Sequence, residues 1–184
     1  MKIPLTYGAA MAIAGALLTF ALFFGGFHDS VEKMQSSFAQ TIAVLGPLLI
    51  AVVCLALAMR DKRSTTPADA PWGYGSALGV GVLTALFGAL FSAVFAYIYF
   101  AFLNPGMADV LYDMQMAKLE EQGSSSQQIE GAEKMMRMML SPAVMSIFQT
   151  ISGFLMTTVV ALVVAIFFKN RPALQYGSQL PPPL

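Results

Sequence analysis

The chain has 184 residues, of which 57% are hydrophobic and 11% are charged, and its mean hydropathy is +0.69. A typical soluble domain has about 25% charged residues, so this composition excludes an ordinary soluble protein. Ten basic and ten acidic residues give a net charge of zero, which by itself argues nothing about nucleic acid. No nucleic-acid partner is expected.

Four apolar runs predict four membrane-spanning helices. Each run is long enough to cross the ~30 Å hydrocarbon core of a bilayer, and none contains Asp, Glu, His, Lys or Arg. The runs are 5–27, 34–59, 76–103 and 142–168. We therefore predict an all-α polytopic membrane protein, with four transmembrane helices in a single domain over 1–171. A cleaved signal peptide is an alternative for the first run, but its end, 24–27, has no A-x-A cleavage pattern.

The second run is expected to follow the first through a tight turn, with Ser30 as the N-cap. Gly46 and Pro47 lie near its middle, and proline removes a backbone hydrogen bond and usually bends a helix. In a transporter such a break can expose carbonyls to an ion, but a packing kink is the simpler interpretation. Cys54, the single cysteine, lies further along this run and has no partner for a disulfide within the chain.

Small residues follow one side of the third run, and in lipid they let helix backbones approach closely. They form two rows at fourfold spacing and a GxxxG pair at one end. The predicted helix-packing residues are Gly75, Gly79, Gly81, Ala85, Gly88, Ala89, Ser92, Ala93 and Ala96. Trp72 and Tyr74 at one end, and Tyr97 and Tyr99 at the other, suit the two headgroup interfaces.

The segment 104–140 is predicted to be an amphipathic helical hairpin on or near the outer membrane surface. Gly123 ends its first helix, and Ser125 with Gln128 matches a capping box for the second. Two i,i+4 pairs, Glu130 with Lys134 and Glu133 with Arg137, support that second helix, on which Ala132 shares an apolar face with Ile129, Met136 and Met139. The residues predicted to dock on a partner or on the membrane are Ile129, Met135, Met136 and Met139.

The fourth run opens with Ser141 as N-cap and Pro142 in the first turn. The positions of the basic residues predict how the chain is oriented across the membrane. Lys2, Arg60, Lys62, Arg63, Lys169 and Arg171 all lie on one side of a four-pass topology. The positive-inside rule places that side, with both termini, in the cytoplasm, and the tail 172–184 is expected to be disordered.

A pattern along nearly the whole chain resembles a known family. It consists of the glycine-rich entry 72–81, the hairpin 104–140, and the residues Tyr97, Tyr99, Phe100, Asn104, Pro105, Ser141 and Pro142. In this pattern the chain is similar to a bacterial inner-membrane family catalogued as domain of unknown function forty-one ninety-nine. The resemblance implies four transmembrane helices and a bacterial inner-membrane location, and it supplies no activity, substrate or binding residues.

No catalytic, metal or cofactor signature stands out, and uncharged spans are poorly suited to intramembrane chemistry. His28, the only histidine, is expected to be a solvated turn residue. The preferred interpretation is a non-catalytic accessory or structural subunit that packs against other membrane proteins, against itself or against lipid. The first alternative is a small oligomeric channel or carrier for an uncharged or lipid-like molecule.

A minor alternative concerns the methionines of the hairpin, because thioethers are soft ligands that suit Cu(I). Met135, Met136, Met138 and Met139 are the candidates. Methionine is also a flexible apolar residue that serves docking surfaces. The docking interpretation is therefore preferred, and no metal or other cofactor is expected.

Overall fold

The computed structural model describes residues 1–169, apart from the side chains of Ser126 and Gln128. All regular elements of the described residues are helices and none is a strand, which confirms the all-α prediction. Its elements are α1 (Lys2–Phe24), α2 (Val31–Met34), α3 (Ser37–Thr65), α4 (Tyr74–Ile98), the π-helix η1 (Tyr99–Leu103), α5 (Met107–Glu121), α6 (Ser126–Met139) and α7 (Pro142–Phe168). The predicted tail, 172–184, lies outside the described residues.

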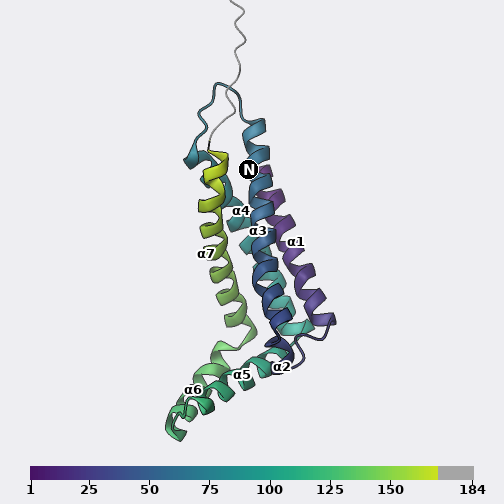
Figure 1. The fold of residues 1–184 in the computed structure, drawn as a ribbon, viewed down its shortest axis with the longest axis vertical. Coiled ribbons are helices and arrows are strands. Elements are labelled where there is room, and N and C mark those ends of the chain that lie inside the picture. Colours follow the sequence, from purple (N-terminus) through teal and green to yellow (C-terminus); the bar gives the residue numbers. More distant parts are fainter. Residues whose placement is uncertain (170–184) are drawn as a thin grey trace, which may run out of the picture.

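Four of these helices are long and apolar enough to cross a membrane: α1, α3, α4 continued by η1, and α7. They confirm the four predicted spans (Figure 1). The helix α3 continues to Thr65, six residues beyond the predicted end of its apolar run. The added turns contain Lys62 and Arg63, and basic residues are favourable at the C-terminal end of a helix dipole. Hydropathy located the apolar part of this helix and not its end.

Two of the predicted caps differ in the structure. Ser30 caps the single turn α2, where its Oγ accepts from the backbone N of Lys33 at 3.4 Å. Ser36 caps α3 instead and accepts from the N of Ala39 at 3.3 Å. Ser141 stands at the N-cap of α7, but its Oγ donates to the carbonyl of Met138 at 2.9 Å and makes no capping bond. Pro142 is the first residue of α7, as predicted.

The buried core gathers at one end of the bundle, where the N-terminus and the loop between α3 and α4 lie (Figure 1). We call it the basic end, because Lys2 and Arg63 are there, and we call the opposite end the hairpin end. Its core residues are Ala51, Leu55, Ala58, Met59, Ala77, Val80, Val160, Ala161, Val164 and Ala165. They join α3, α4 and α7 tightly.

Three polar contacts reinforce the basic end. Trp72 Nε1 donates to the carbonyl of Phe168 at 2.8 Å, and the Tyr74 hydroxyl donates to the carbonyl of Leu162 at 3.1 Å. Both bonds hold the start of α4 against the last turns of α7. The Tyr7 hydroxyl donates to Asp61 Oδ2 at 2.5 Å and ties α1 to α3.

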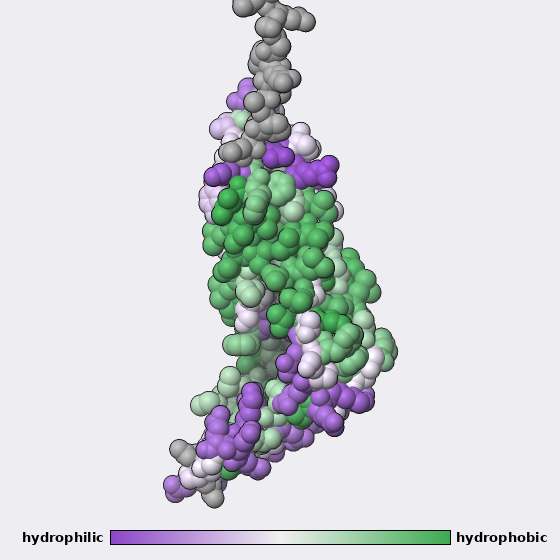
Figure 2. Space-filling model, in the orientation of Figure 1, coloured by the Kyte–Doolittle hydropathy of each residue, from purple (hydrophilic) through white to green (hydrophobic). Residues whose placement is uncertain are grey.

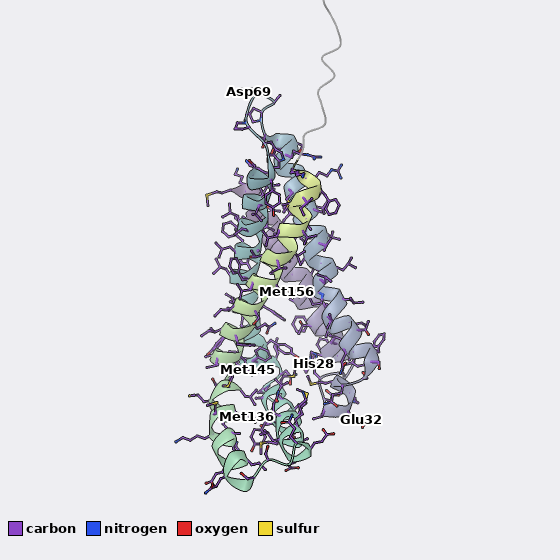
Figure 3. The ribbon with its side chains drawn as sticks, turned by 60° about the vertical axis from the view of Figure 1, so that its left-hand side comes forward. His28, Glu32, Asp69, Met136, Met145 and Met156 are labelled. Carbon is purple, nitrogen blue, oxygen red and sulfur yellow. The ribbon has the colours of Figure 1, made fainter. Side chains whose placement is uncertain are left out.

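Toward the hairpin end, α3 and α7 are no longer packed into the core. No residue between 40 and 50 on α3, and none between 147 and 159 on α7, is buried. The two helices diverge in this half in the turned view (Figure 3). The bundle is therefore closed at the basic end and open between α3 and α7 at the hairpin end.

The predicted hairpin consists of α5 and α6, which meet at Gly123, a residue with φ +70° that allows the turn. Glu133 and Arg137 form the expected i,i+4 pair, at 3.1 Å between Oε1 and Nη2. The Arg137 guanidinium also lies 5.0 Å from the ring centre of Tyr112 on α5. The hairpin leaves the bundle obliquely and extends sideways beyond α7 (Figure 1).

Candidate functional site

Two adjoining cavities lie between the helices in the open half of the bundle. Their volumes are about 200 and 270 Å³. They share five lining residues from all four spanning helices: Gly15, Thr19, Pro47, Phe95 and Gln149. Together they form one region, which we call the inter-helix cavity. Figure 2 shows a hollow at this level, below the continuous apolar surface of the bundle.

Polar side chains line the mid-bundle part of the cavity. Thr19 and Thr150 donate to carbonyls one turn earlier in their own helices, those of Gly15 at 3.0 Å and Ser146 at 2.6 Å. Three further polar lining residues have no hydrogen-bond partner among the described residues: Ser92 on α4, and Gln149 and Thr157 on α7. In an apolar medium such groups cost free energy until a partner arrives. The cavity therefore offers unused donors and acceptors.

A cluster of three polar residues, His28, Tyr99 and Asn104, lies at the hairpin end of the cavity. The Tyr99 hydroxyl lies 2.6 Å from His28 Nδ1 and accepts from Asn104 Nδ2 at 2.9 Å. Burial lowers the pKa of His28, although the nearby Asp29 acts in the opposite direction. At neutral pH the imidazole is therefore uncharged and can either donate or accept a hydrogen bond. Figure 3 shows His28 at the hairpin end of the bundle, at about the level of Met145 of α7.

These positions correct two sequence-based expectations. His28 is half-buried in the cavity wall and is not a solvated turn residue. Tyr99 is only 2% exposed and does not face a headgroup interface, whereas Tyr97 is 47% exposed. Tyr97 and Tyr99 are about 200° apart around the helix, and Tyr99 joins Phe23, Phe95 and Phe100 in an aromatic cluster where the π-helix η1 begins. Single-turn π-helices occur frequently at functional sites.

The predicted helix-packing residues fall into three groups. Gly81 and Gly88 make close contacts: a Cβ on Gly81 would lie 2.9 Å from the Cβ of Ala161, and one on Gly88 would meet the Met11 side chain. Gly75 and Gly79 have open space around them within this chain. The remaining predicted residues are buried or half-buried: Ala85, Ala89, Ser92, Ala93 and Ala96, of which all except Ala93 line a cavity.

The close approach of α1 to α4 depends on Gly8 of α1. A Cβ on Gly8 would lie 2.8 Å from the backbone N of Gly88 and 2.9 Å from the carbonyl oxygen of Thr84. The two backbones are thus in contact at this point. This contact brings the cavity-lining residues of α1 beside those of α4.

The predicted docking residues of α6 are split between two surfaces. Ile129 and Met136 are half-buried, and Met135 and Met139 are exposed. The helix turns about 100° per residue, so the four methionine positions, Met138 included, spread over about 160° of α6. Met135, Met138 and Met139, at i, i+3 and i+4, lie on one side of the helix, and Met136 lies apart from them on the half-buried side. Among the described residues there is also no group of three or more His, Cys, Asp or Glu side chains that could hold a metal ion.

The inter-helix cavity is not among the features predicted from the sequence, although a signal was present. Polar residues within apolar runs are expensive in lipid and mark functional positions more often than apolar ones do. Gln149, Thr150 and Thr157 interrupt the fourth run in this way. The sequence places these residues along one helix. It does not show that α3 and α7 diverge beside them and leave a cavity.

Comparison with known proteins gives one match. The family model described as "Protein of unknown function (DUF4199)" matches residues 6–170, which include all four spanning helices and the hairpin. No match is found among the curated proteins or among the solved structures. The resemblance noted from the sequence is thereby confirmed: the chain belongs to the DUF4199 family.

Proposed function

We propose that this protein is a non-catalytic membrane protein that binds an uncharged, lipid-like molecule in the inter-helix cavity. One observation carries the proposal: Ser92, Gln149 and Thr157 line a cavity between spanning helices and have no partner among the described residues. A ligand with a hydrogen-bonding end would satisfy these groups, while its apolar part would meet the surrounding Ala, Phe and Leu side chains.

The lining residues favour a neutral ligand. Among the described residues, those that line the two cavities include no Asp, Glu, Lys or Arg to pair with a charge. An unpaired charge at membrane depth would be costly. The two adjoining volumes of about 200 and 270 Å³ together suit a small ligand, or one end of a larger amphiphile, given that ligand pockets commonly have ~300–1,000 Å³.

The geometry also supports a route of entry from the bilayer. Gln149 lines both cavities and is itself exposed, so the cavity opens to the outside at α7. The unburied stretches 40–50 and 147–159 border this opening. A molecule dissolved in the leaflet at the hairpin end would reach the polar groups by passing between α3 and α7.

The proposal includes an orientation in a bacterial inner membrane. The basic end carries Lys2, Arg60, Lys62 and Arg63, and the positive-inside rule assigns it to the cytoplasm. Both termini would then be cytoplasmic, and the cavity would open in the outer leaflet. Reactivity of single cysteines with a membrane-impermeant thiol reagent in intact cells tests this: labelling at Ser64→Cys and not at Gln127→Cys would contradict it.

A paired substitution tests the binding. The full chain is purified with its native lipids in mild detergent, and bound molecules are identified by native mass spectrometry. We expect Gln149→Leu to reduce the bound fraction at least several-fold. Gln40→Leu is the matched control, because Gln40 is exposed on α3 and lines neither cavity. Equal binding by both variants, or no bound molecule in the unchanged protein, would refute the proposal.

A second candidate is the accessory subunit that packs against other membrane proteins or against itself. The observation that favours it is the open space around Gly75 and Gly79, a GxxxG pair on an exposed part of α4. Oligomeric state and co-purifying proteins in mild detergent test it. Gly79→Leu should dissociate the assembly, and Gly131→Leu, at an equally open site on α6, should not.

A further inference from the structure

The helix α6 carries an apolar surface that the rest of the described chain leaves uncovered. Met135, Met138 and Met139 are 60%, 66% and 50% exposed. Glu130, Lys134 and Arg137 are also exposed. At about 100° per residue the charged group occupies one side of the helix and the methionines occupy another. We call Met135, Met138 and Met139 the methionine face.

The methionine face is separate from the surface that α6 uses within the hairpin. Ile129, Ala132 and Met136 are half-buried and lie on a third side of the helix. Arg137 lies over the ring of Tyr112, so the charged side is also fixed relative to α5. The methionine face is not part of these contacts, so Met135, Met138 and Met139 can contact something outside the hairpin.

The connections of the hairpin determine what is nearest to it. The π-helix η1 ends at Leu103 and α5 begins at Met107, while α6 ends at Met139 and α7 begins at Pro142. Both ends of the hairpin are thus joined through links of two or three residues to helices long and apolar enough to span the bilayer. These short links hold the hairpin close to the surface of the bilayer.

The direction of the hairpin agrees with this neighbour. It extends sideways beyond α7 and does not continue the axis of the bundle (Figure 1). In the space-filling view the visible face of the hairpin is mostly hydrophilic, with scattered apolar residues (Figure 2). A helix with a charged side and a separate apolar side is typical of one that lies in an interface.

We infer that the hairpin rests on the bilayer at the hairpin end, with the methionine face inserted among the lipid headgroups. Flexible thioether side chains adapt to an irregular surface of this kind. The inference does not depend on what occupies the inter-helix cavity.

The charges of the hairpin decide the mode of attachment. Acidic residues outnumber basic ones two to one over 107–139: Asp109, Asp113, Glu120, Glu121, Glu130 and Glu133 against Lys118, Lys134 and Arg137. A net negative segment is not attracted to anionic lipids. The attachment is apolar insertion, so it is insensitive to salt and does not require anionic headgroups.

Fluorescent labels on single cysteines test the inference in the full chain. In a Cys54→Ala background, Met135→Cys, Met138→Cys and Met139→Cys carry an environment-sensitive dye, and Glu130→Cys and Lys134→Cys are matched controls on the same helix. The protein is placed in nanodiscs of zwitterionic lipid at one copy per disc. Lipids brominated near the headgroup serve as quenchers.

We expect blue-shifted emission and at least about twofold quenching at the three methionine positions, little quenching at the two control positions, and no change at high salt. Equal quenching at all five positions would overturn the inference. So would solvent-like emission at the methionine positions. A blue shift that appears only in discs with two copies would assign the methionine face to a second copy of the chain.

Discussion

The hydroxyl of Tyr99 lies 2.6 Å from Nδ1 of His28 and joins the loop after α1 to the π-helix that ends α4. These residues are 71 positions apart in the chain. The same hydroxyl accepts from Asn104, which follows η1 directly. One buried oxygen thus fixes the hairpin end of α4 and one wall of the inter-helix cavity.

Removing that oxygen should destabilise the protein. Tyr99→Phe keeps the ring among its aromatic neighbours but leaves His28 and Asn104 without their shared partner. We expect a loss of about 1–3 kcal/mol in the free energy of unfolding, measured by thermal or denaturant unfolding in detergent. Tyr97→Phe is the control, since the Tyr97 side chain is largely exposed. Equal stability of the two variants would show that the network contributes little.

The protonation of His28 should make the stability depend on pH. Burial holds the pKa of folded His28 below the ordinary value of 6.5, so the unfolded chain takes up the proton first as the pH falls. The contribution of His28 is therefore complete above about pH 6.5 and is lost as the pH falls from there toward the lower pKa of the folded state. Unfolding midpoints at pH 7.5 and pH 5 should differ less in His28→Gln than in the unchanged protein. An identical pH dependence in both would contradict this assignment.

The contact between α1 and α4 should not tolerate a side chain at Gly8. Its Cβ would lie within 3 Å of backbone atoms of Thr84 and Gly88, which cannot rotate away. Gly8→Ala should cost about 1–3 kcal/mol of stability through this overpacking. Gly79→Ala, where the Cβ would meet open space, should be neutral or stabilising. Comparing the two unfolding curves measures the contact, and similar losses in both variants would indicate a general cost of replacing helical glycine.

The hydrogen bonds between α4 and α7 at the basic end give a further test. Tyr74→Phe removes the donor to the Leu162 carbonyl, and Trp72→Phe removes the shorter bond to the Phe168 carbonyl. We expect losses of about 0.5–1.5 kcal/mol for the tyrosine and more for Trp72→Phe, which also loses buried ring surface. Unfolding followed by far-UV circular dichroism is the measurement. A larger loss for Tyr74→Phe would contradict this ranking.

The four spans could be predicted from the sequence because their signal is local. Uncharged runs of more than 20 residues form helices in lipid irrespective of their neighbours, and Pro142 marked the start of α7 correctly. The prolonged end of α3 was missed because a helix continues in water after its apolar run ends. The sequence could not show whether Ser30 or Ser36 caps α3, since serine is a common N-cap residue and both precede the apolar run.

The cavity could not be predicted for a different reason. Gly79 and Gly81 have the same local chemistry, but only Gly81 has Met59 and Ala161 against it. Tyr97 and Tyr99 are two residues apart in the same aromatic segment, and the packing of α1 against α4 decides which of them is buried. Such differences arise from how whole helices diverge, which involves residues far apart in the chain.

The uneven burial along the bundle has a mechanical consequence. The basic end is clamped by Leu55, Met59 and Ala161, whereas α3 and α7 touch little of each other at the opposite end. Segments with few buried contacts move at lower free-energy cost than a packed core, so the stretches around Val44 and Phe148 are expected to be the most mobile parts of α3 and α7.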